Sequence, residues 1–149
     1  MRAFREAVEA GDLDAVEALL AEDVVFSSPA VFKPYQGKAI TAAILRTVFG
    51  VFEDFRYDRE LTSADGRDHA LVFNARVDDR ELSGCDFIHV DEDGLIDAFT
   101  VMVRPLSGLQ ALAAAMGAQF DRIAKEAQAR SVWGSRARPR ARGPAGGGA

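Results

Sequence analysis

The apolar residues at the start of the chain recur at helical spacing. Residues 2–10 form one such segment, whose shared face consists of Phe4, Ala7 and Val8. Gly11 ends this helix, and Asp12 is suited to cap the next one. The apolar face of the second helix consists of Leu13, Val16, Leu19 and Leu20. The pattern therefore predicts a short helical hairpin.

Two further helices are predicted from the same spacing. Residues 38–51 carry an apolar stripe that consists of Ile40, Ile44, Leu45, Val48 and Phe49. Ser107 is suited to cap a long last helix, whose stripe consists of Leu109, Leu112, Met116, Phe120 and Ile123.

Alternating segments predict five strands. The first is "DVVFS" at residues 23–27, followed by a loop that contains Pro29 and Pro34. The next places Phe55, Tyr57 and Leu61 on one face. In "HALVFNARV", at residues 69–77, one face carries Leu71, Phe73, Ala75 and Val77, and the other carries Asn74 and Arg76. An Asp78-Asp79 turn leads to a strand over 81–91, and "DEDG" leads to the last, over 95–104.

Helices that precede a run of mainly antiparallel strands indicate an α+β fold. A strongly curved sheet that wraps around the helices would enclose an apolar cavity. Residues 1–130 are expected to form one domain. Residues 131–149 are rich in Arg, Pro, Gly and Ala and are expected to be disordered.

Composition narrows the function classes. With a single cysteine, Cys85, among 149 residues, no intrachain disulfide is possible, and we expect a cytoplasmic protein without a membrane-spanning segment. Residues 131–149 hold four arginines, so residues 1–130 keep 14 basic residues against 23 acidic ones, a net charge of −9. This acidic domain argues against binding to nucleic acid. We expect no cofactor and no metal site, because no second histidine or cysteine is suitably spaced.

Three strings carry a family resemblance: "AGDLDAVEALLAEDVVFSSP" at 10–29, "YQGKAITAAIL" at 35–45 and "GCDFIHVDEDGLIDAFTVMVRP" at 84–105. Through them the chain resembles the SnoaL-like branch of the NTF2-like superfamily over about residues 3–125. The resemblance implies a cystatin/NTF2-like cone fold, a pocket between the curved sheet and the helices, and a homodimer formed through the outer face of the sheet. The fold hosts isomerases, cyclases, epoxide hydrolases and binding modules, so the resemblance does not fix an activity.

The ketosteroid isomerases are similar over the same strings. Their catalytic base, an aspartate before the proline that ends the first strand, corresponds to Ser28, and a serine hydroxyl without a partner base has no useful basicity. Their oxyanion-binding tyrosine corresponds to Phe4. Their second oxyanion donor, an aspartate, matches Asp86, which is retained. The isomerase mechanism of that family is therefore not expected here.

Asp86 is the candidate catalytic residue. In an apolar setting its pKa would rise, and the protonated carboxyl could donate to a ligand oxygen. The alternative is a structural acid that accepts hydrogen bonds from the backbone, from Tyr35 or from Tyr57.

Other candidate sites are weaker. The Arg-x-Asp spacing of Arg76 and Asp78 resembles that of epoxide hydrolases of this superfamily, but the final acid of their pattern corresponds to Val101, and a solvated hairpin end is favoured. His89 falls on the face opposite Asp86, where it would lie near Arg104 on a dimer face. Cys85 is expected to be a buried, inert thiol.

Aromatic residues from separate elements are expected to hold an apolar small molecule. The expected ligand-binding residues are Phe4, Phe26, Ser28, Tyr35, Phe55, Tyr57, Phe73, Phe99 and Val101. The leading hypothesis is a protein that binds a small molecule in an apolar pocket, and the sequence does not decide whether it also catalyses a reaction. The alternatives are an isomerase, cyclase or hydratase that uses Asp86 as acid and base, and a dimeric interaction module without a ligand.

Overall fold

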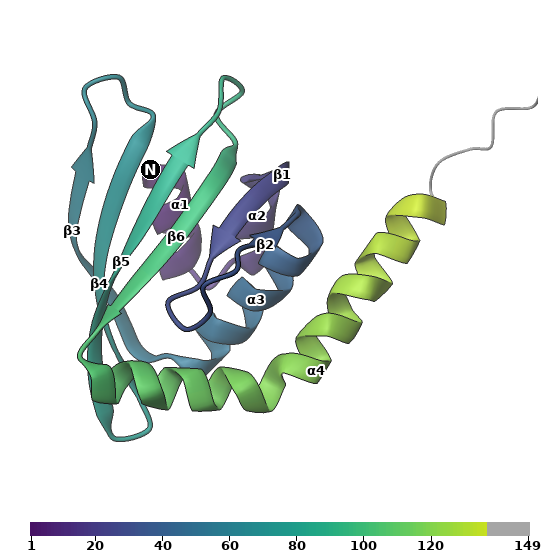
Figure 1. Cartoon of the computed structure of the whole chain (residues 1–149). Helices are drawn as coiled ribbons and strands as arrows, with labels where there is room; N and C mark the ends of the chain where they lie inside the picture. Colours follow the sequence, from purple (N-terminus) through teal and green to yellow (C-terminus); the bar gives the residue numbers. More distant parts are fainter. Residues whose placement is uncertain (137–149) are drawn as a thin grey trace, which may run out of the picture.

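Six strands form one curved sheet in the order β2-β1-β6-β5-β4-β3 in a computed structural model that describes residues 1–136 (Figure 1). The strands are β1 (Leu20–Ser27), β2 (Tyr35–Gln36), β3 (Glu53–Thr62), β4 (Asp68–Val77), β5 (Arg80–Val90) and β6 (Ile96–Arg104). β1 pairs with β6 in parallel, and the other neighbouring strands are antiparallel. The strands β3 to β6 therefore form a meander of three hairpins, and β1 pairs with the last strand of that meander, β6.

The helices pack against one face of this sheet, which we call the inner face. They are α1 (Arg2–Glu9), α2 (Leu13–Ala18), α3 (Lys38–Val51) and α4 (Leu106–Arg136). The side chain of Asp12 accepts a hydrogen bond from the backbone N–H of Ala15 over 3.1 Å, as expected for a helix cap. In Figure 1, α4 follows the lower end of the sheet and then turns upward on the side of α3. The α+β fold predicted from the sequence is confirmed.

The inner face carries the core. On β4, the predicted alternation is confirmed, since Leu71, Phe73, Ala75 and Val77 are all buried. Gly84 lies opposite Phe73 on β5, and a Cβ atom at Gly84 would lie 2.2 Å from Cζ of Phe73. A glycine is therefore required at this position for the Phe73 ring to lie flat against the sheet.

Two local predictions were wrong, and one strand was missed. Leu20 begins β1 and does not belong to the second helix. Leu61 is 56% exposed on the outer face, because the register of β3 shifts between Tyr57 and Arg59 and leaves Asp58 as an extra residue. Such a bulge moves every later side chain of the strand to the other face. The short strand β2 was not predicted at all.

The C-terminal helix extends past residue 130, where the domain was expected to end. α4 continues to Arg136, six residues into the segment that was expected to be disordered. The remainder of the predicted tail, residues 137–149, lies outside the described residues.

Candidate functional site

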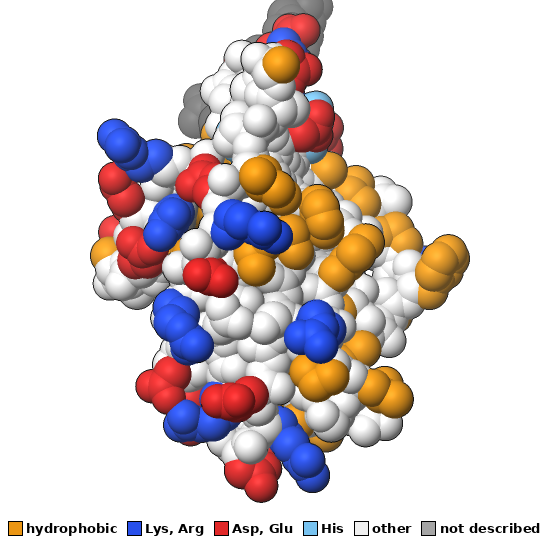
Figure 2. All heavy atoms as spheres, turned by 90° about the vertical axis from the view of Figure 1, so that its left-hand side faces the viewer, with side chains coloured by type: hydrophobic (Ala, Val, Ile, Leu, Met, Phe, Trp, Pro, Cys, Tyr) orange, Lys and Arg blue, Asp and Glu red, His pale blue; other side chains and the backbone are white. Residues whose placement is uncertain are grey.

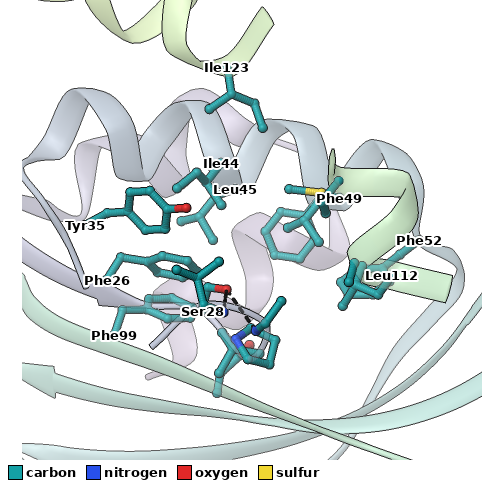
Figure 3. Close-up of a pocket in the computed structure, with 18 of the residues that line it drawn as sticks. Phe26, Ser28, Tyr35, Ile44, Leu45, Phe49, Phe52, Phe99, Leu112 and Ile123 are labelled. Carbon is teal, nitrogen blue, oxygen red and sulfur yellow. Dashed lines mark hydrogen bonds between the residues drawn. The ribbon is translucent and has the colours of Figure 1, made fainter. Parts of the chain in front are cut away.

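A cavity of about 320 Å³ lies between the inner face and the helices α3 and α4 (Figure 3). Its sheet wall contains Phe26, Phe55, Phe73, Phe99 and Val101. α3 and the residue after it contribute Ile44, Leu45, Val48, Phe49 and Phe52, and α4 contributes Leu112, Ala113, Met116, Gly117, Phe120 and Ile123. The rings of Phe55 and Phe73 stack at 5.0 Å between centroids, so this part of the wall is a continuous aromatic surface.

Asp86 is the only acidic or basic side chain in the cavity wall, among the residues that the structure describes. It lies in the middle of β5, where the strand alternation turns it inward, and it is only 4% exposed. Burial in this apolar setting raises the pKa of Asp86 to about 7, although the hydrogen bond from Tyr57 acts to lower it. Near neutral pH the carboxyl group is therefore available in both protonation states.

Tyr57 supports Asp86 from behind the cavity wall. Its hydroxyl donates a hydrogen bond to Oδ2 of Asp86 over 3.1 Å. Burial and the neighbouring Asp86 carboxylate raise the pKa of Tyr57, so the phenol keeps its proton. The guanidinium of Arg5 lies over the Tyr57 ring, 5.9 Å from its centre. Tyr57 thus fixes one oxygen of Asp86, and the other oxygen has no hydrogen-bond partner in the described part of the chain.

Ser28 and Tyr35 bring two more polar groups to the cavity. Oγ of Ser28 accepts hydrogen bonds from the backbone N–H groups of Ala30 and Val31, over 3.0 and 3.3 Å, and so shapes the loop after β1. The serine proton remains available for donation. Figure 3 shows the Tyr35 ring beside Phe26, with its oxygen directed toward the cavity.

Eight of the ten side chains singled out in the sequence line the cavity: Phe26, Ser28, Tyr35, Phe55, Phe73, Asp86, Phe99 and Val101. Phe4 and Tyr57 do not. Phe4 is fully buried beneath Phe99, with 5.5 Å between the ring centroids, and Tyr57 contacts Asp86. Phe4 and Tyr57 therefore support the cavity wall from behind and do not line the cavity.

The wall residues of α3 and α4 were missed as site residues. The helical stripe that includes Leu45 and Phe49 was recognised, but a stripe that faces the core and one that faces a cavity have the same spacing. Phe52, which follows α3 and lies 5.6 Å from the ring of Phe73, carried no signal of its own.

The secondary candidates lie away from the cavity. His89 is on the outer face, as predicted, where Nδ1 lies 2.6 Å from Oδ1 of Asp97. It is not near Arg104, contrary to the prediction, because His89 pairs with Ala98 and Arg104 pairs with Ser83 at the far end of β6. Cys85 is half-buried on the same outer face, and burial raises the pKa of its thiol.

Arg76 is engaged at a hairpin end. It forms ion pairs with Glu53 and Asp54, and it donates to the backbone carbonyl of Asp78 over 3.0 Å. All three partners lie outside the cavity wall, so the geometry does not bring an Arg-x-Asp pair to the cavity.

Within residues 1–136, no group of three or more His, Cys, Asp or Glu side chains is arranged to hold a metal ion. None of the described helices combines the length and the apolar character needed to cross a membrane.

The sequence model of the SnoaL-like domain family matches residues 1–99 of this chain. The structure is also similar to that of a steroid delta-isomerase from Pseudomonas aeruginosa, with 50% sequence identity, a TM-score of 0.77, and coverage of 80% of this chain and 87% of that chain. An uncharacterised protein with a cystatin-like fold from Silicibacter pomeroyi DSS-3 is 38% identical, with a TM-score of 0.78 and coverage of 85% and 91%.

More distant structures share the fold alone. A putative polyketide cyclase from Pseudomonas putida KT2440 is 24% identical, with a TM-score of 0.59 and coverage of 72% of this chain and 90% of that chain. No curated protein matches the chain at a significant level. The domain match covers about two thirds of the chain, and the two structures above 30% identity are covered almost completely. This chain therefore belongs to the SnoaL-like family.

Proposed function

We propose that this protein binds an apolar small molecule and meets a carbonyl or hydroxyl oxygen of that molecule with Asp86. The observation that carries the proposal is one buried carboxyl group in the wall of an otherwise apolar cavity. Apolar walls supply most of the affinity in such sites, and a few polar groups fix the orientation. The 50% identity to a protein described as a steroid delta-isomerase supports a rigid, apolar ligand with an oxygen function.

The protonated form of Asp86 is the form that recognises such an oxygen. Because Tyr57 donates to Oδ2, the second carboxyl oxygen of Asp86 carries the proton and donates to the ligand. The pKa of Asp86, raised by burial to about 7, keeps that proton in place below neutral pH. A ligand carbonyl oxygen facing the ionised form would meet a second acceptor and no donor, whereas a ligand hydroxyl group could still donate to the carboxylate.

A steroid ketone is the probe for a first test, with binding measured by calorimetry at pH values below and above the Asp86 pKa of about 7. We expect the affinity to fall about tenfold above neutral pH, as the donor is lost. Asp86→Asn keeps a donor at all pH values, so its affinity should not depend on pH. Asp58→Asn, the same change at an exposed acid, should behave like the native protein. Absence of binding, or native binding that ignores pH, would contradict the proposal.

The second candidate function is acid–base catalysis at the same residue, namely isomerisation, cyclisation or hydration. A carboxyl group with a pKa near 7 can take a proton from a carbon beside a carbonyl and return it to another carbon of the same molecule. Ser28 cannot share this work, because it is a weak base whose oxygen already accepts two backbone hydrogen bonds. Asp86 would have to act alone.

Conversion of a non-conjugated steroid enone to its conjugated isomer, followed by absorbance, separates the two functions. If the protein is a catalyst, the native protein should turn over the enone. Asp86→Asn should lose this turnover and still bind the ketone. If the native protein binds the steroid and forms no product, the binding function stands and the catalytic function is excluded.

The proposed partner is a second copy, which contacts this chain through the outer face of the sheet. Apolar side chains are exposed there, with Leu61, Phe87 and Met102 at 56%, 43% and 59%. Figure 2, a view from the side of β3, shows hydrophobic side chains gathered over one part of the surface, with Lys and Arg side chains beside them. Exposed apolar patches of this kind are typical of interfaces.

The charges on this face support a two-fold arrangement. Arg56 and Arg104 lie in one row across the strands, while Asp68 lies at the other end of the face, beside His89 and Asp97. A two-fold axis through the apolar patch would set the arginines of one copy over the acids of the other. Sedimentation analysis should give a dimer for the native protein and for Phe32→Glu, a change at a fully exposed loop residue, and a monomer for Met102→Glu. A native monomer would contradict the arrangement.

A further inference from the structure

The cavity has a second polar group, on a strand that β1 and β6 separate from the strand of Asp86. The hydroxyl of Tyr35 is directed into the cavity (Figure 3), and it forms no hydrogen bond within residues 1–136. Oγ of Ser28, in the loop between β1 and β2, lies in the same part of the wall. A phenylalanine at position 35 would pack against Phe26 equally well, so packing alone does not explain the hydroxyl group.

The strand register places the two polar groups far apart. Tyr35 pairs with Phe26, Phe26 pairs with Phe99, and Phe99 pairs with Ile88, two residues beyond Asp86 on β5. Three strand spacings amount to about 14 Å along the sheet. Both side chains line the cavity, and along the sheet the rings of Phe26 and Phe99 lie between them.

We propose that the ligand carries oxygen functions at both ends of an apolar skeleton, and that Tyr35 binds the oxygen remote from Asp86. This inference rests on the proposed binding function and specifies its ligand class. A phenol both donates and accepts, so Tyr35 takes either a carbonyl or a hydroxyl group. A hydrophobic molecule with one oxygen would cover the Tyr35 hydroxyl without giving it a partner, which disfavours that molecule relative to a ligand with two oxygen functions.

Two fluorescent probes that differ by one hydroxyl test this: para-phenylphenol, and the biphenol with a second hydroxyl at the far end of the same ring pair. Dissociation constants are measured below pH 7, where Asp86 keeps its proton. We expect the native protein to bind the biphenol about fivefold more tightly, the effect of one additional neutral hydrogen bond. Tyr35→Phe should remove this preference by weakening the biphenol alone.

Thr62→Val is the control, since it removes an exposed hydroxyl group that lies outside the cavity wall. It should retain the preference for the biphenol. Equal affinities in the native protein, or a preference that persists in Tyr35→Phe, would overturn the inference while the cavity still binds both probes. If neither probe binds the native protein, the proposed function fails, and the inference fails with it.

Discussion

Replacement of Asp86 by Asn should abolish a specific pH dependence of stability. The ordinary pKa of an aspartate is 3.8, and burial raises that of Asp86 to about 7 in the folded protein. Between these values the folded state holds the proton while the unfolded chain has released it. The free energy of unfolding therefore falls as the pH rises from about 4 to about 7, and the loss remains constant above that.

The magnitude follows from the size of the shift. From 3.8 to about 7, at about 1.4 kcal/mol for each pH unit, the native protein loses about 4 kcal/mol of stability through this group. Asp86 is 4% exposed, so solvent screening reduces this figure little. Asn has nearly the same shape, and its carbonyl oxygen accepts the hydrogen bond from Tyr57, so the variant keeps the packing without the ionisation.

Urea denaturation at several pH values between about 4 and 8 measures the effect. The stability of Asp86→Asn relative to the native protein should rise by about 4 kcal/mol across this range. Comparison with the native protein cancels the other titrating groups, such as His89, whose pKa Asp97 raises. Asp58→Asn at an exposed position should show no such trend. A difference between native protein and Asp86→Asn that does not vary with pH would refute the reasoning, because it would mean that Asp86 ionises freely when folded.

Two further changes probe the surroundings of this carboxyl group. Tyr57→Phe removes a hydrogen bond that lowers the pKa of Asp86, so the carboxyl titration followed by NMR should move upward; a downward movement would contradict the assigned contact. Gly84→Ala places a Cβ atom 2.2 Å from the Phe73 ring and should destabilise the fold by about 1–3 kcal/mol while narrowing the cavity. Gly50→Ala, in α3 with no atom within 4 Å of the new Cβ, should instead stabilise by about 0.5–1 kcal/mol, and equal effects of the two alanines would exclude the steric account.

The sequence was most informative where local rules determine the structure. α3 was predicted with its observed bounds, because Gly37 precedes it and an apolar stripe at helical spacing runs along it. The inward positions of Phe73 and Asp86 followed from strand alternation and the family resemblance, since neither β4 nor β5 contains a bulge in their shared register. Eight of the ten expected site residues lie in the cavity wall, although Tyr35 belongs to a strand that the sequence did not predict.

The predictions that failed concern features that depend on contacts between distant parts of the chain. The bulge at Asp58 turned Leu61 outward, and nothing in the alternation of β3 marks it. The hydrogen bond between Tyr57 and Asp86 joins residues 29 positions apart, and it depends on the registers of two strand pairs at once. Sequence reasoning could name Tyr57 as one possible partner of Asp86, but it could not choose between Tyr57 and Tyr35.

Binding and reactivity depend on the same proton in this cavity. Asp86 is the only charged group in the described wall, so its proton is the only strong donor that a ligand oxygen meets there, and its carboxylate is the only base. With a pKa near 7, the form that binds an oxygen best and the form that abstracts a proton are equally populated near neutral pH. Ser28 does not supply a second base. The protonated form of Asp86 would therefore hold a substrate oxygen, and the ionised form of the same residue would have to abstract the proton. A productive reaction therefore needs another donor for the ligand oxygen while Asp86 is ionised, and the hydroxyl groups of Ser28 and Tyr35 are the neutral side-chain donors in the described wall.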